Sequence, residues 1–187
     1  MEQPSQVCRV SRSTRISLAA ALVAVLFITA RSAGAQSFDT AFGSGALASN
    51  VSGNNDSAFG ANALNLNTSG SFNTATGNGA LATNNADNNT ATGFEALLNN
   101  TTGSQNTAVG SDALVANTTG SGNTAVGRGA LAANTVNGHN TATGFSALGG
   151  NTTGIENTAA GFDALLGNTT GIENTATGSD ALLSNTT

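Results

Sequence analysis

Beyond residue 35 the sequence contains no cysteine and no proline, and no lysine occurs anywhere in the chain. Cys8 and Pro4 are the only residues of their types. Small exported domains often rely on disulfides when they cannot build a large core. Residues 36–187 cannot use that device, so their fold must depend on packing and hydrogen bonds.

Positive charge is also nearly absent. Residues 36–187 hold nine acidic residues against one basic residue, Arg128, which gives a formal charge of −8 with histidine neutral. Binding to a polyanion needs clustered lysine or arginine side chains that displace counterions. The composition therefore excludes nucleic acid and acidic membrane surfaces as partners.

The first 35 residues differ from the rest. They begin with a positive region and continue with an apolar stretch over 18–30 and the small residues Ala33-Gly34-Ala35. This layout predicts a secretory signal peptide over 1–35, with Gln36 as the first residue of the mature chain. An uncleaved anchor would need roughly 20 apolar residues, so residues 36–187 are predicted to be secreted or held at the cell surface without a membrane span. The positive region consists of Arg9, Arg12 and Arg15.

From Asp39 onward the sequence repeats one unit, N-T-A-x-G-x-x-A-L-x-x-N-T-T-G-x-x. A short fixed period is typical of a solenoid, in which each repeat forms one coil. The period is 17 residues except in the third copy, which has 16, and the ninth copy stops early at Thr187, so we expect the array to continue beyond it. The nine copies begin at Asp39, Asp56, Asn73, Asn89, Asn106, Asn123, Asn140, Asn157 and Asn174.

Five positions of the repeat are invariant: alanine at three, glycine at five, alanine-leucine at eight and nine, and asparagine at twelve. N-T-A-x-G predicts a short strand that ends at a glycine with positive φ. The segment around Ala-Leu fits a second strand or a single helical turn, because adjacent apolar residues do not alternate. N-T-T-G is typical of a turn.

Stacking these units predicts an all-β repeat fold, a β-solenoid (β-roll or β-helix) of about nine 17-residue coils over residues 36–187. Each invariant position becomes a column: leucines form a buried spine, and asparagines at position twelve bond side chain to side chain. At roughly 4.8 Å per coil the rod is on the order of 40 Å long. One leucine per coil makes a thin core, which favours association with further chains.

Variable positions carry the phenylalanines. They could fill the core or anchor a subunit interface, and we expect packing within or between protomers rather than ligand contact. Any binding must involve the positions that vary, namely four, six, seven, sixteen and seventeen. These phenylalanines are Phe42 and Phe59 at position four, and Phe94, Phe145 and Phe162 at position six.

Catalytic and metal-binding patterns are missing. His139 is the only histidine and stands at a variable turn position, so no catalytic triad or zinc-ligand spacing can be assembled. The acids at positions seven and seventeen do not recur in every copy, and we expect them to solvate the surface rather than bind calcium. We therefore predict no enzyme activity, no cofactor and no metal site. These acids are Glu95, Asp112, Asp163 and Asp180 at position seven, and Glu156 and Glu173 at position seventeen.

Two units, N-T-A-T-G-F-E-A-L-L-N-N-T-T-G (89–103) and N-T-A-V-G-S-D-A-L-V-A-N-T-T-G (106–120), carry a family resemblance. They resemble the YadA-like head repeats of trimeric autotransporter adhesins and related bacterial surface and phage tail-fibre-like proteins. The resemblance covers roughly residues 38–187. It implies a β-roll that forms a homotrimer, stands outside the cell and binds host, matrix or cell-surface ligands.

The sequence thus predicts an exported structural or adhesive protein that binds through a solenoid face. An alternative is ice binding through rows of threonine. Four copies, those starting at Asn73, Asn89, Asn140 and Asn174, read T-A-T, which places two threonines on one face of the strand. In the other copies the second threonine is replaced by Phe, Val or Ala.

Export of the chain in a bacterial host is expected to remove residues 1–35, because the small residues before Gln36 suit signal peptidase. The check is the intact mass and N-terminal sequence of the protein recovered outside the cytoplasm. A product that keeps residues 18–30 would contradict the signal-peptide interpretation.

Overall fold

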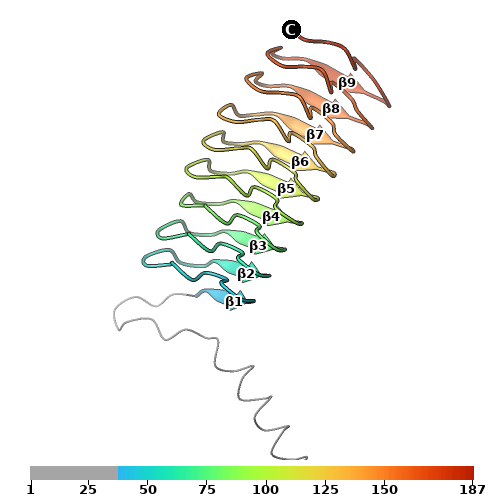
Figure 1. Ribbon diagram of the computed structural model, residues 1–187. Coiled ribbons are helices and arrows are strands. Elements are labelled where there is room, and N and C mark those ends of the chain that lie inside the picture. The colour runs from blue at the N-terminus through green and yellow to red at the C-terminus, as the bar shows by residue number, and fades with distance from the viewer. Residues whose placement is uncertain (1–37) are drawn as a thin grey trace, which may run out of the picture. The chain divides into compact units, whose positions relative to one another are not determined.

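The structure, a computed structural model, describes residues 38–187, so the predicted signal peptide over 1–35 and Gln36 lie outside the described residues. The described part is a stack of similar coils, each contributing one strand to a single parallel sheet in chain order (Figure 1). The strands are β1 (Thr40–Phe42), β2 (Ser57–Phe59), β3 (Thr74–Thr76), β4 (Thr90–Thr92), β5 (Thr107–Val109), β6 (Thr124–Val126), β7 (Thr141–Thr143), β8 (Thr158–Ala160) and β9 (Thr175–Thr177).

Neighbouring strands pair with equivalent residues side by side. Ala108 of β5 pairs with Ala125 of β6, and Thr107 with Thr124. The prediction of an all-β solenoid with a 17-residue period is confirmed. The 16-residue copy keeps this register too, since Ala75 of β3 pairs with Ala91 of β4.

The corner after Asn84 absorbs the missing residue. In the other coils up to the eighth, the position-twelve amide donates to a carbonyl three residues later, as from Asn100 Nδ2 to the Gly103 oxygen at 2.8 Å. Asn84 Nδ2 donates instead to the Ala86 oxygen two residues later, at 2.7 Å. The shortened corner therefore keeps the same buried hydrogen bond, and the strands on either side stay aligned.

The Ala-Leu segment is neither strand nor helical turn. It consists of successive turns in which an N–H donates to the carbonyl three residues earlier, for example Asn65 to Asn62 and Asn67 to Leu64. Leu64 has φ of 49°, and the leucine of every coil lies in the same left-handed region. The chain bends at this residue, so Ala63 and Leu64 are both fully buried although they are adjacent.

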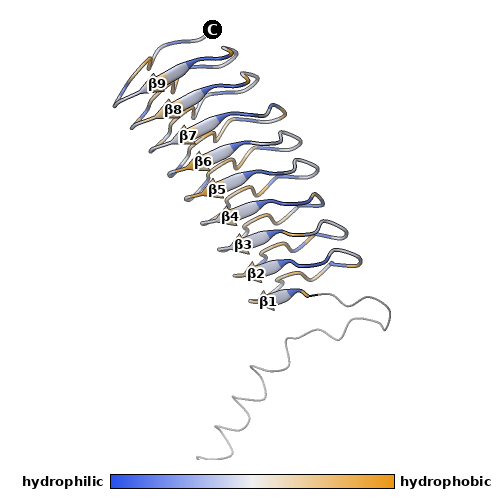
Figure 2. Cartoon of the chain, turned by 180° about the vertical axis from the view of Figure 1, so that it is seen from behind, coloured by the Kyte–Doolittle hydropathy of each residue, from blue (hydrophilic) through white to orange (hydrophobic). Residues whose placement is uncertain are grey.

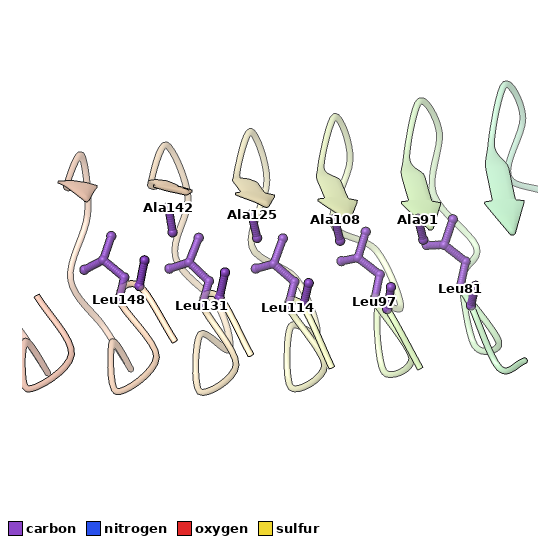
Figure 3. Packing of buried hydrophobic residues seen from close by; sticks show 14 of the residues in the cluster. Leu81, Ala91, Leu97, Ala108, Leu114, Ala125, Leu131, Ala142 and Leu148 are labelled. Atoms are coloured by element: carbon purple, nitrogen blue, oxygen red, sulfur yellow. The ribbon is translucent and has the colours of Figure 1, made fainter. Parts of the chain in front are cut away.

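Alanines and leucines form the core. The central alanine of each strand faces inward against the leucine row, as Figure 3 shows for the middle coils. In the first eight coils the leucine N–H also donates to the alanine carbonyl of the next coil, as from Leu114 to Ala130 at 3.0 Å. The leucine spine is confirmed, and the fully buried members are Leu64, Leu81, Leu97, Leu114, Leu131, Leu148 and Leu165.

Asparagines at position twelve form the predicted side-chain column. Asn117 Nδ2 donates to Asn100 Oδ1 at 2.8 Å, and Asn134 Nδ2 donates to Asn117 Oδ1 at 3.0 Å. The chain of amide bonds runs from Asn84 to Asn185. From Asn100 onward each amide also donates to the corner carbonyl of its own coil, so both of its N–H groups have acceptors.

A second buried column, at position one, was not predicted. The backbone N–H of Asn106 donates to Asn89 Oδ1 at 3.0 Å, and Asn106 Nδ2 donates to the Gly120 oxygen 14 residues later at 2.8 Å. The buried Asn174 Nδ2 has no acceptor among residues 38–187. Figure 2 shows the hydrophilic stretch that enters each strand and contains this column.

Position five requires glycine because of its backbone conformation and because of the nearby backbone of the next coil. Gly110 has φ of 135°, and a Cβ placed on it would lie 2.5 Å from the Gly127 oxygen of the next coil. Gly178, in the last coil, has φ of 124°, but its nearest neighbour would be Ala181 Cβ at 3.9 Å. In the inner coils a side chain at this position is therefore excluded both by the positive φ and by the close approach of the next coil. In the last coil only the positive φ excludes it.

Gly110→Ala is expected to destabilise the fold more than Gly178→Ala. Both variants strain the backbone at a cost of about 1–3 kcal/mol. Only Gly110→Ala also overpacks against the next coil, which costs about 1–3 kcal/mol more. Urea unfolding followed by circular dichroism measures both, and equal losses would contradict the role assigned to coil stacking.

Candidate functional site

The outward face of the sheet is built from positions two and four. Strands β3, β4, β7 and β9 carry threonine at both positions, and the inward alanine between them is buried. The regular register of the sheet aligns these side chains from coil to coil. The row at position four is interrupted by Phe42, Phe59, Val109, Val126 and Ala160.

The phenylalanines at positions four and six do not fill the core. Phe42 is 68% exposed and Phe59, its partner in the sheet register, is 43% exposed. Phe94, Phe145 and Phe162 at position six are also exposed. Of the two roles predicted from the sequence, core filling is therefore wrong.

Position six carries a short aromatic stack. The rings of Phe145 and Phe162 have centroids 5.2 Å apart and planes within 9° of parallel. The Arg128 guanidinium carbon lies 5.5 Å from the centroid of the Phe145 ring, within cation–π distance. The sole arginine of residues 36–187 thus continues a column of side chains that repeats once per coil.

The acids of positions seven and seventeen do not converge. Two at position seven accept hydrogen bonds from the preceding serine: Ser111 Oγ donates to Asp112 Oδ2, and Ser179 Oγ donates to Asp180 Oδ2. In residues 38–187, no three His, Cys, Asp or Glu side chains come together as a metal site would require. His139 lies at a left-handed turn position with φ of 61°.

Two carboxylates at position one of the repeat were not singled out from the sequence. Asp39 and Asp56 replace asparagine at position one of the first two coils, and Asp56 is fully buried. Asp56 Oδ1 accepts from the backbone and side chain of Asn73 at 2.8 and 3.1 Å, and Oδ2 accepts from Asn67 Nδ2 at 3.0 Å. The sequence could have indicated these two residues, because position one is asparagine in all the other copies of the repeat.

The turns around position seven of the second, third and fourth coils border a surface hollow. An open hollow of about 390 Å³ lies there, lined by polar and apolar side chains that include Asn62, Asn78, Glu95 and Leu98. It lies on the turn segments that follow β2, β3 and β4, away from the aromatic stack of the later coils. It was not predicted, because the repeat pattern describes what the copies share and not the side chains that differ between adjacent copies.

Residues 38–187 include no helix with the length and apolar character needed to cross a bilayer. Neither a protein-family model, a curated protein nor a solved structure matches the chain. Function must therefore be argued from the solenoid and its surface.

A double-mutant cycle on Arg128→Gln and Phe145→Leu is expected to give a coupling of about 0.5–1 kcal/mol in unfolding free energy, as for an exposed cation–π pair. The matched control pairs Arg128→Gln with Phe94→Leu, which alters a more distant phenylalanine of the same column. Equal coupling in both cycles would contradict a specific stacking contact.

Proposed function

We propose that this chain is an exported structural or adhesive protein that self-associates as a homotrimer and binds host, matrix or cell-surface ligands through its solenoid face. The observation that carries this proposal is that the repeat divides into mostly buried invariant positions and exposed variable ones. In the second to eighth coils its invariant alanines, leucine and asparagine are buried, whereas its large variable side chains, including five phenylalanines at positions four and six, are exposed. A scaffold that repeats while its outer columns vary suits binding spread over an extended surface.

The exposed phenylalanines support self-association. Phe42 and Phe59 lie next to each other on the outward face of β1 and β2. Contiguous exposed apolar side chains commonly mark interaction surfaces. Because the core is restricted to small alanines and one leucine per coil, burying this face against further copies would add substantially to the apolar area removed from water.

Ice binding is the second candidate. It is favoured by the outward threonine pairs of β3, β4, β7 and β9, which stand in register on a parallel sheet. It is disfavoured by Phe42 and Phe59, which replace threonine at one end of the same row. Thermal hysteresis of the purified chain decides between the two, and its absence would exclude ice binding.

Self-association is tested by sedimentation equilibrium of the purified chain, with three chains per particle expected. Replacing both Phe42 and Phe59 with serine should shift the particle towards monomer, because their apolar surface would no longer drive association. The control is Thr74→Ser with Thr76→Ser on the same face. A stable monomer across the concentration range would contradict the trimer.

Adhesion is tested separately, with beads that carry the chain and are allowed to settle on cultured epithelial cells. Retention under flow is expected to exceed that of beads carrying the Phe42→Ser, Phe59→Ser chain. Equal retention, at the level of uncoated beads, would count against a role in adhesion.

A further inference from the structure

The hollow over the second to fourth coils has two small residues of the third coil in its lining. Gly79 and Ala82 occupy positions seven and ten, where the fourth coil carries Glu95 and Leu98. A Cβ placed on Gly79 would meet Glu95 Cγ and Leu98 Cδ1 at 3.4 Å, so these side chains border the space. The second coil supplies the opposite wall, with asparagine at positions seven and ten.

Three polar side chains at this hollow have no partner within the protein. In the described part of the chain, no hydrogen bond or ion pair engages the side chains of Asn62, Asn78 or Glu95. The neighbouring Asn65 differs, because its amide donates to the Gly45 oxygen at 2.8 Å. The hollow thus presents amide donors and acceptors together with a carboxylate that only accepts when ionised.

Apolar walls accompany these polar groups. Leu66 and Leu98 line the hollow, and Leu66 is 49% exposed. No lysine, arginine or histidine contributes to it, and Arg128, the sole arginine after residue 35, lies against Phe145. A phosphate or sulfate group would face a carboxylate without a counter-charge, which disfavours anionic ligands.

We propose that this hollow binds one or two residues of a neutral carbohydrate. The apolar C–H faces of a sugar ring would pack on Leu66 and Leu98, while its hydroxyls would donate to Glu95 and exchange hydrogen bonds with Asn62 and Asn78. A volume of about 390 Å³ is within the roughly 300–1,000 Å³ of small-ligand sites. This inference rests on the proposed function, because it names a ligand class for one part of the adhesive surface.

The test is an NMR titration of the ¹⁵N-labelled full chain with the methyl glycosides of glucose, galactose, mannose and N-acetylglucosamine, and with cellobiose. At least one is expected to shift the amide signals of Asn78, Glu95 and Leu98 while leaving those of the seventh to ninth coils unchanged. Ala82→Leu should weaken this binding by about tenfold or more by filling the hollow. It should fold, because leucine occupies position ten natively at Leu98, Leu166 and Leu183.

Ala132→Leu is the matched control, since it makes the same change at position ten of the sixth coil, outside the hollow. Glu95→Gln should also weaken binding while keeping the shape of the site. The inference is overturned if no glycoside shifts these signals, if Ala82→Leu binds as well as the native chain, or if only a cationic probe such as methylammonium binds.

The two proposals fail in different ways. Retention of beads on cells together with a failed titration would leave the adhesive function standing and remove the carbohydrate site. A positive titration with no retention on cells would support the site and count against adhesion.

Discussion

Satisfaction of the buried backbone is the constraint on which the solenoid depends. Only three residues of each coil form a strand, so most backbone groups need partners that a sheet does not supply. Backbone hydrogen bonds between neighbouring coils supply many of them, such as the bond from the Leu131 N–H to the Ala147 oxygen at 3.0 Å, and two columns of buried asparagine supply others. At position one, Asn106 Oδ1 accepts the backbone N–H of Asn123 in the next coil, and at position twelve the amides bond each other while holding the corner carbonyl. Since an unpaired buried polar group costs about 1–3 kcal/mol, each coil depends on its neighbour to complete this network.

Glycine and leucine positions follow from the same stacking. The amides of adjacent coils lie in register only if the coils are in close contact. At Gly110 the backbone lies so close to the next coil that a side chain would clash with it. Leucine fills the interior, and its backbone there has a left-handed conformation that this residue rarely adopts. The repeat retains both features in every copy, which explains why its invariant letters describe the scaffold rather than a site.

The period, the strand at N-T-A and the leucine and asparagine columns could be predicted, because each follows from one residue type recurring at one spacing. The shape of the Ala-Leu segment could not, since a left-handed Leu64 is contrary to its local preference. The buried column at position one was missed because asparagine before a strand is also ordinary turn chemistry. The hollow beside Glu95 is lined by residues that differ between copies, such as Gly79 and its equivalents in the adjacent coils. A repeat pattern describes only what the copies share, so it could not predict this hollow.

Hydrogen exchange measured by NMR tests the central claim most directly. The backbone N–H groups of Asn106, Asn123 and Asn140 donate to buried side-chain oxygens of the preceding coil. They should therefore be as strongly protected as the strand amides of β5 and β6, although they precede the strands. Exchange of these three amides at the rate of exposed turns would contradict an account in which asparagine columns hold the coils together.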